Sequence, residues 1–420
     1  MKFLLPAAAV LFSTCLLHAV APADVVDATT IRHKVMCGYQ GWFKAPGDGT
    51  ELGWSHWSWD RNRVTAKTVN FEMWPDMTDY PAQERYPVPG FTYPDGTPAS
   101  LFSANNRATV LRHFQWMRDY GIDGIWLQRF TVGLPGVKPT LTQYQPYLDV
   151  LHYSQDAASQ TGRAWAISYD VAGTPTDKIF DAVVADWKKL VDAKITNDPR
   201  YLHQAGLPVV QIWGFYFRNK TNLITPEVGN RLIDFFQHPG PYHAYLVGGG
   251  NWDSATRTDP QWQAMFKRFD AYTPWNIGNK SVDAKGVAHA SMGWWAADRQ
   301  TFESRGQVWI PTVYAGFSWD NLTKSPPGSS NIPRRRGQFL WEQFHQLSKM
   351  GGIDTVYLAM FDEVNEGTAI FKITNNPPTQ ARFLGYEGLP SDWYMRLVGL
   401  GEKMLKEKQP VPAEIPIKPS

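Results

Sequence analysis

The chain has 420 residues, of which 43% are hydrophobic and 19% are charged, a composition that excludes an intrinsically disordered protein. Its 41 Lys and Arg nearly balance 39 Asp and Glu, which argues against nucleic acid or an anionic membrane as the main partner, because both need a basic surface. The 19 Trp are the unusual number. They indicate either the aromatic platforms of a sugar-binding cleft or a large core that is rich in Trp.

The first 23 residues have the pattern of a secretory signal peptide. Lys2 is the only charge before Asp24, and an apolar run leads to the small residues Ala21-Pro22-Ala23. We expect cleavage after Ala23 and a secreted or periplasmic protein. We expect no integral membrane segment once the signal is removed, because the run is short for a spanning helix. A lipoprotein is the alternative, since Ser13-Thr14-Cys15 loosely resembles a lipid-attachment box.

Beyond the signal, short apolar runs alternate with longer amphipathic ones. The runs that are bounded by Gly, Pro or Asp predict eight strands, at 34–42, 122–130, 163–171, 207–215, 244–250, 271–278, 307–317 and 354–363. Apolar residues at helical spacing predict helices at 105–120, 178–193, 226–237, 260–269, 333–350 and 393–408. Near-continuous apolar strands are typical of a parallel sheet that is covered on both sides. We therefore predict an α/β fold, a (β/α)8 TIM barrel. A doubly wound open sheet is the alternative, although no Gly-rich phosphate loop follows the first strand.

The first predicted strand is followed by a long insertion, residues 43–104, that is rich in Pro, Gly and aromatic residues. Long loops after barrel strands usually build the active site. The last residues, 409–420, contain four Pro and predict a loose tail. The expected organisation is a signal peptide over 1–23, one catalytic barrel domain over 24–408 and a Pro-rich C-terminal tail over 409–420.

A barrel of this type places its chemistry at the C-terminal ends of the strands. Aromatic, amide and charged residues at those ends and in the insertion are the predicted substrate contacts: Tyr39, Trp42, His56, Trp57, Gln128, Arg129, Asp170, Trp213, Asn251, Trp252, Trp275, Tyr314, Trp319 and Asp362. The set has no cluster of His or Cys, so we expect no catalytic metal, and we expect no cofactor. A G-x-S-x-G nucleophile elbow is absent as well.

Three of these residues have a second interpretation. Asp170 could orient substrate hydroxyls or cap the turn after its strand. Arg129 could contact substrate or pair with a neighbouring carboxylate, either Glu366 or Asp170. A single His is more often structural, but His56 lies among three Trp of the insertion, which favours a place in the site.

The most informative motif is FDEVNEG, residues 361–367, at the expected end of the eighth strand. Asp362, Glu363 and Glu366 stand within five positions. Carboxylates this close repel each other, so at least one pKa should be raised if they share a partly buried site. Glycosidic cleavage needs such a pair, with one carboxyl protonated to donate to the leaving oxygen and another ionised. The alternative is an acidic turn in solvent that caps the strand.

Two segments resemble motifs of glycoside hydrolase family 99 and of the wider family 71/99-like group, which is often labelled xylosidase/arabinosidase. Residues 38–57 are similar to the opening of that fold, where an aromatic motif on strand one is followed by a Pro, an Asp-Gly turn and a His-Trp pair. Residues 361–370 are similar to the final motif, F-N-E-x-x-E-G-T, which ends strand eight. The order of elements also fits, so the resemblance covers most of residues 34–375.

The resemblance implies a retaining endo-α-mannosidase on a (β/α)8 barrel, without a metal. In that family the first Glu of E-x-x-E is the base for the substrate 2-hydroxyl, which attacks the anomeric carbon to form a 1,2-anhydro sugar. The second Glu protonates the leaving group and then activates water. The matching positions in this chain are Glu363 and Glu366.

The chain also departs from the family pattern. Asp362 stands where the family has Asn, Val364-Asn365 replaces an aromatic-His pair, and Gln40-Gly41 is inserted in the first motif. These changes leave the mechanism in place and leave the choice between mannose and another hexose or pentose open.

We therefore expect a secreted glycoside hydrolase that acts on a polysaccharide or glycan, of endo-α-mannosidase or xylosidase/arabinosidase type. One alternative is a non-catalytic carbohydrate-binding protein on the same barrel, and another is an unrelated secreted barrel in which FDEVNEG is structural. The hydrolase hypothesis requires Glu363 and Glu366 to share one open cleft with four aromatic residues: Tyr39, Trp42, Trp252 and Trp319.

Overall fold

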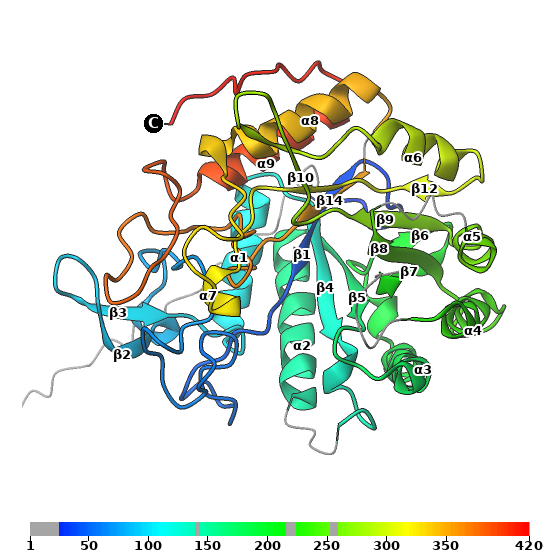
Figure 1. Cartoon of the computed structure of the whole chain (residues 1–420). Coiled ribbons are helices and arrows are strands. Elements are labelled where there is room, and N and C mark those ends of the chain that lie inside the picture. Colours follow the sequence, from blue (N-terminus) through cyan, green and yellow to red (C-terminus); the bar gives the residue numbers. More distant parts are fainter. Residues whose placement is uncertain (1–24, 139–142, 216–223, 253–258, 354, 420) are drawn as a thin grey trace, which may run out of the picture.

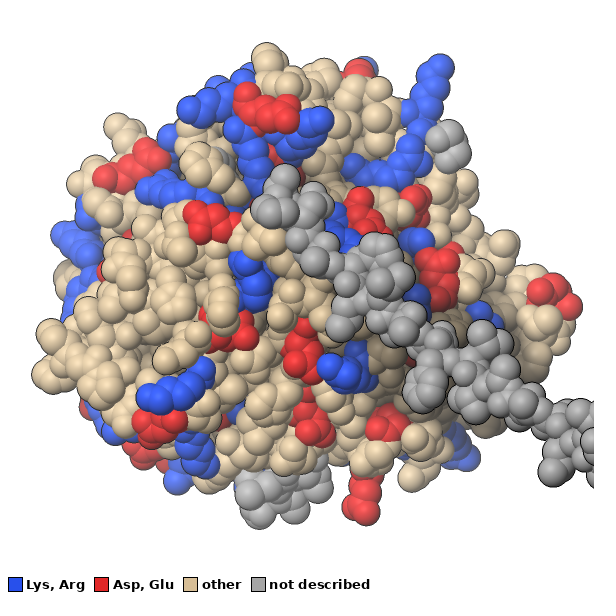
Figure 2. Space-filling model, turned by 180° about the vertical axis from the view of Figure 1, so that it is seen from behind, with Lys and Arg blue, Asp and Glu red and all other residues tan. Residues whose placement is uncertain are grey.

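The computed structural model describes residues 25–138, 143–215, 224–252, 259–353 and 355–419. The predicted signal peptide lies outside these residues. Across the described ranges, no helix is both long enough and apolar enough to cross a membrane. Figure 2 shows one face of the molecule, where basic and acidic side chains are interspersed.

The core of the described chain is one curled parallel sheet (Figure 1). Its segments in spatial order are β12 (Val308–Trp309), β9 (Ala271–Trp275), β8 (Tyr245–Asn251), β7 (Leu207–Phe215), β5 (Ala164–Asp170), β4 (Gly124–Phe130), β1 (Lys34–Tyr39), β14 (Thr355–Ala359) and β13 (Thr312–Tyr314). All neighbours in this order are parallel. A short additional strand, β6 (His203–Gln204), pairs antiparallel with β7.

β12 and β13 stand at opposite ends of this order, although they belong to one stretch of chain. Ile310 N donates to Tyr272 O on one side of the stretch, and Tyr357 N donates to Pro311 O on the other. Residues 308–314 therefore act as the seventh strand and close the sheet. The predicted (β/α)8 barrel is confirmed, and its eight strands overlap the eight predicted ranges.

The barrel strands are buried on both faces because their side chains alternate between the barrel interior and the surrounding helices. β1 and β14 are buried along their full length. Glycine is needed at one close approach. A Cβ on Gly250 of β8 would lie 1.7 Å from Phe215 O, so any larger residue there would push β8 away from β7.

Helices surround the barrel (Figure 1): α1 (Arg107–Asp119), α2 (Tyr144–Thr161), α3 (Thr176–Asp192), α4 (Pro226–Gln237), α5 (Pro260–Phe266), α6 (Trp295–Glu303), α8 (Gln338–Met350) and α9 (Trp393–Lys406). Local signals set their starts. The Asn106 side chain accepts from Ala108 N before α1, and Thr225 precedes Pro226 at the start of α4. The predicted helices are present, whereas α2 and α6 were not predicted.

The insertion after β1 is folded rather than an open loop. It contains an antiparallel hairpin of β2 (Tyr86–Thr92) and β3 (Pro98–Leu101), and its core includes the buried Trp54, Trp57 and Trp74. In Figure 1 this hairpin lies on the same side as the single-turn helix α7 (Asp320–Thr323). A second hairpin joins β10 (Lys280–Val282) and β11 (Ala288–Ala290).

The C-terminal tail lies along α8. Trp341 Nε1 donates to Pro412 O at 2.9 Å, His345 Nδ1 lies 2.7 Å from Val411 O, and the Val411 side chain is buried. These contacts hold a segment that the sequence predicts to be loose.

Candidate active site

The FDEVNEG segment is a compact turn at the C-terminal end of β14. Phe361 N donates to Gly38 O of β1, which holds the start of the turn against the neighbouring strand. Thr368 N and Ala369 N both donate back to Glu363 O. Gly367 has φ +63°, a conformation in which glycine carries no steric penalty. The turn therefore presents residues 362–366 at the barrel end where (β/α)8 enzymes place their chemistry.

Glu363 is buried and held by three N–H donors. Its Oε1 accepts from Asn365 N at 2.6 Å and from Glu366 N at 3.2 Å, and its Oε2 accepts from Gln40 Nε2 at 2.7 Å. Burial, together with the nearby charges of Glu366 and Asp362, raises the pKa of Glu363 well above its ordinary value of 4.5. The N–H donors fix the orientation of the carboxyl, and the burial makes it a stronger base once it is ionised.

Asp362 does not face the substrate space, contrary to the prediction. Its two carboxyl oxygens accept from Gln40 N at 2.8 Å and from Gly41 N at 3.0 Å, and the side chain is fully buried. Burial raises the pKa of Asp362 to about 7 in spite of these two donors. Asp362 therefore holds the turn after β1, and this turn carries the Gln40 amide to Glu363.

Glu366 is less buried than Glu363, and the residues next to it fix its backbone. Its backbone oxygen accepts from Ser318 N at 2.9 Å. Asn365 Nδ2 donates to His56 O at 2.7 Å and to Asn70 O at 2.9 Å, which ties the turn to the insertion. The Asn that replaces the His of the family pattern thus has an anchoring role, and its side chain is directed to the insertion backbone.

A cavity of about 630 Å³ opens at this end of the barrel. Ten of the sixteen predicted site residues line it: Trp42, Gln128, Asp170, Trp213, Asn251, Trp252, Trp275, Trp319, Glu363 and Glu366. The two glutamates thus share one cavity with three of the four aromatic residues that the hydrolase hypothesis requires. Sequence reasoning missed Gln40, Phe130, Phe317, Tyr357 and Thr368, which also line the cavity.

The other predicted residues point elsewhere, because side chains alternate along a barrel strand. Gln128 faces the interior, where its Nε2 donates to Tyr357 Oη at 3.0 Å. The next residue, Arg129, faces the helix layer and pairs with Asp186 of α3 at 2.5 Å. Arg129 is buried there, so neither predicted partner, Glu366 or Asp170, is its partner, and it does not reach the cavity.

Tyr39, Tyr314 and Trp57 are also buried outside the cavity. Tyr39 Oη lies 2.8 Å from His113 Nδ1 of α1, and Tyr314 Oη donates to Asn279 O. Trp57 Nε1 donates to Phe102 O at 3.1 Å in the core of the insertion. Each polar group is satisfied by a protein partner, so these three residues support the scaffold, and the prediction that they contact substrate is wrong.

Trp42 lines the cavity but cannot act as a stacking platform. One face of its indole stacks on His56 at a centroid distance of 3.8 Å, and the other stacks on Phe130 at 4.7 Å. Burial lowers the pKa of His56 to about 3, so the imidazole in this stack is neutral. His56 therefore sits behind Trp42 as a packing partner instead of in the cavity.

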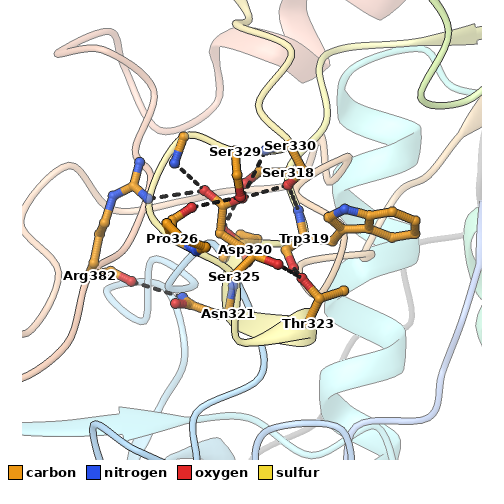
Figure 3. Close-up of polar contacts among 12 residues, drawn as sticks. Ser318, Trp319, Asp320, Asn321, Thr323, Ser325, Pro326, Ser329, Ser330 and Arg382 are labelled. Carbon is orange, nitrogen blue, oxygen red and sulfur yellow. Dashed lines mark hydrogen bonds and ion pairs between the residues drawn. The ribbon is translucent and has the colours of Figure 1, made fainter.

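Trp319 lies at the cavity rim, and 41% of its side chain is exposed. Figure 3 shows the loop that carries it, folded around the carboxylate of Asp320. This carboxylate accepts from Ser330 Oγ, Ser330 N and Gly328 N and pairs with Arg382 at 3.2 Å. Burial alone would raise the pKa of Asp320, but the hydrogen bonds lower it to about 2. The loop is therefore held in one conformation around a permanently ionised group.

The insertion braces the same loop from its other side. Glu72 accepts from Ser318 Oγ at 2.9 Å and from Asn321 N at 2.5 Å. Glu72 N also donates to Val364 O of the FDEVNEG turn. One buried carboxylate thus connects the insertion, the Trp319 loop and the catalytic turn.

The described residues contain no group of three or more His, Cys, Asp or Glu that could hold a metal ion. Among the described residues that line the cavity, Asp170, Glu363 and Glu366 carry ionisable carboxyls, and none is Lys, Arg or His.

Comparisons with known proteins identify the fold. No family model matches the chain, and no curated protein is similar to it in sequence. Two solved structures of the GH99 endo-α-mannosidase from Bacteroides thetaiotaomicron, one of them in complex with bis-tris-propane, share its architecture, with TM-scores of 0.66 and 0.64. Sequence identity is 14% and 13%, and each alignment covers 91% of this chain and 99% of the other. The likeness shows the fold and extends over nearly the whole of both chains.

Proposed function

We propose that the protein is a glycoside hydrolase whose working pair is Glu363 and Glu366. The observation that carries the proposal is their position, on one turn at the end of β14 and in one cavity that is walled by Trp213, Trp252 and Trp275. Tryptophan presents a broad apolar surface with a polar edge, which suits a sugar ring with apolar faces and polar hydroxyls. The likeness to a GH99 endo-α-mannosidase supports the same conclusion.

The two carboxyls take different roles in this proposal. Glu363, oriented by three N–H donors, is the base that removes the proton of the substrate 2-hydroxyl. The freed oxygen attacks the anomeric carbon, and Glu366 gives its proton to the departing glycosidic oxygen, so that a 1,2-anhydro sugar forms. Glu366 then takes a proton from the water that opens this ring, and the glutamate that began as base returns its proton to the 2-oxygen. The ordinary retaining scheme, in which a carboxylate is the nucleophile, uses the same pair.

The charge of the cavity narrows the substrate class. Its ionisable lining groups are carboxyls, which would repel uronic acids and sulfated sugars. We propose a neutral oligosaccharide or polysaccharide, with manno-, xylo- and arabino-configured chains as the first candidates. The signal-like N-terminus supports action outside the cytoplasm on such a polymer.

The test is hydrolysis of a panel of neutral oligosaccharides and polysaccharides, followed by product analysis. Glu363→Gln and Glu366→Gln should each lower kcat/KM on the cleaved substrate by about 10²–10⁴-fold. Glu342→Gln, on α8, is the matched control, and it should keep full activity. Thermal unfolding of all three variants checks that the fold persists.

Two outcomes would count against the proposal. Full activity in either active-site variant would refute its assigned role. Binding of a saccharide without cleavage of any panel member would favour a non-catalytic carbohydrate-binding protein. The anomer released first, read by NMR, distinguishes retention from inversion.

A further inference from the structure

Two tryptophans near the cavity mouth are largely exposed. Trp59 of the insertion is 53% exposed and Trp319 is 41% exposed. Across the described ranges, Val25 and Val282 are the other large apolar side chains that are exposed to this degree. Leaving an indole in water forgoes about 1.5–3 kcal/mol of burial free energy, so two such residues at one place need a reason.

Both tryptophans flank the same helical turn, α7. Trp319 directly precedes α7 and lines the cavity. Lys324 directly follows α7, and its Nζ lies 5.9 Å from the ring centroid of Trp59. The two indoles are therefore placed one after the other, Trp319 at the cavity rim and Trp59 on the far side of α7.

The backbone at each ring is fixed. Trp319 N donates to Ser330 Oγ at 3.1 Å, within the network around Asp320 that Figure 3 shows. Trp59 N donates to Thr68 O at 2.8 Å, next to the antiparallel bridge between Ser58 and Val69. Rings on a rigid backbone lose little conformational freedom when they bind, so more of the contact energy is kept as affinity.

The surroundings of the two rings favour a saccharide over a protein partner. A protein interface has a contiguous apolar centre. Here a polar turn separates the rings, and the loop around Trp319 carries hydroxyl and amide side chains: Asn321, Thr323, Ser325, Ser329 and Ser330. Alternation of a flat apolar ring with hydrogen-bonding groups matches a sugar chain, whose rings expose C–H faces and whose rims carry hydroxyls.

We propose that Trp319 and Trp59 form an aromatic track that binds sugar units of a neutral saccharide chain outside the cavity. The inference rests on the proposed function for the identity of the ligand. The unit next to the cavity stacks on Trp319, and a unit farther along the chain stacks on Trp59. The protein thus binds a chain that is longer than its cavity, and affinity rises with chain length until both rings are covered.

The experiment uses a homologous series of oligosaccharides, from two to eight units, of the polysaccharide that the wild type cleaves. In the wild type, kcat/KM should rise with length and reach a plateau. Trp59→Ala should lower the plateau about five- to tenfold and leave the shortest cleaved substrate unaffected. Trp319→Ala should lower kcat/KM already at an intermediate length, and Trp59→Tyr should lose less than Trp59→Ala. Val282→Ala removes an exposed apolar side chain of β10 and is the control without effect.

Loss of the same factor on the shortest and longest substrates would overturn the track, as would full activity of both alanine variants on every length. If the wild type cleaves no member of the series, the proposed hydrolase fails, and the track is tested by electrophoresis in gels that contain the same polysaccharides. Retardation that Trp59→Ala weakens would support the track without catalysis, and equal retardation of wild type and variant would overturn it. A change confined to self-association, seen by sedimentation, would assign the rings to a second copy of the chain and also overturn it.

Discussion

At the scale of single residues, the environment of Glu363 is set by Gln40. Gln40 follows β1, and its Nε2 donates to Glu363 at 2.7 Å while its own backbone N–H is held by Asp362. An N–H donor favours the ionised carboxylate and so lowers its pKa, against the burial that raises it. Gln40 is therefore a positioning residue that acts through Glu363.

Gln40→Met keeps the length of the side chain and removes the donor, so the pKa of Glu363 should rise further. If Glu363 works as an ionised base, activity is lost as the pH falls through its pKa. The acidic limb of the kcat/KM profile should then move to higher pH in the variant, with little change at alkaline pH. Gln338→Met removes a donor to Ala413 O on the outer helix α8 and serves as control. An acidic limb that stays in place in Gln40→Met would contradict the role assigned to Gln40.

Some residue assignments followed from the sequence, and others needed the register of the barrel. FDEVNEG was found because three carboxylates at a strand end form an unusual local pattern. Gln128 and Arg129 were both predicted to contact substrate, yet alternation directs one inward and the other to α3. A strand that is buried on both faces carries no polarity signal to show which of two adjacent residues faces inside.

At the scale of elements, the loop from Ser318 to Ser330 depends on Asp320. Asp320→Ala would remove the acceptor of the Ser330 and Gly328 N–H groups and free Arg382. We expect Trp319 to become mobile and KM to rise by about fivefold, which corresponds to roughly 1 kcal/mol of ring contact, with kcat little changed. Steady-state kinetics and the fluorescence anisotropy of the tryptophans measure the two effects.

The matched control for that prediction is Asp283→Ala in the β10–β11 hairpin. Asp283 also accepts backbone N–H groups, from Lys285 at 2.9 Å and Val287 at 2.8 Å, but its turn is remote from the cavity lining. It should leave KM unchanged. A kcat that falls while KM stays constant in Asp320→Ala would show that the loop positions the reacting groups instead of the substrate.

Helices were predicted where a strong apolar period meets a clear start signal. α4, with Thr225 and Pro226 at its start, occurs at the predicted bounds. α2 was missed because its buried face includes small or polar residues such as Ser154 and Ala157, which weaken the apolar period. α6 was missed for a related reason, since Asp298 is on its buried face, where it accepts from Trp309 Nε1 at 2.9 Å.

At the scale of the whole molecule, the many tryptophans serve two purposes. Five line the cavity, at Trp42, Trp213, Trp252, Trp275 and Trp319. Eleven are buried in the core: Trp54, Trp57, Trp74, Trp116, Trp126, Trp165, Trp187, Trp295, Trp309, Trp341 and Trp393. Composition could not separate these uses, because a strand-end Trp and a core Trp look alike until the barrel places them.

The barrel is joined to its helix layer by a buried ion pair between Arg129 of β4 and Asp186 of α3. Arg129 Nε and Nη2 donate to the two oxygens of Asp186 at 2.5 and 2.6 Å, and Tyr169 Oη of β5 donates to the same carboxylate at 2.8 Å. Removal of one member would leave the other charge buried without its partner. Arg129→Met should therefore lower the free energy of unfolding by about 3–5 kcal/mol.

The double variant Arg129→Met/Asp186→Leu should be more stable than the sum of the two single losses predicts, because it leaves no buried charge behind. Chemical denaturation of the four proteins completes the cycle. Arg129 faces α3 and lies outside the cavity lining, so the single and double variants should keep the wild-type kcat/KM at temperatures where they are folded. A loss of 10²-fold or more in folded Arg129→Met would return Arg129 to the substrate-contacting role that its place at a strand end first suggested. Retained activity with lowered stability would fix it as the link between the barrel and its helices.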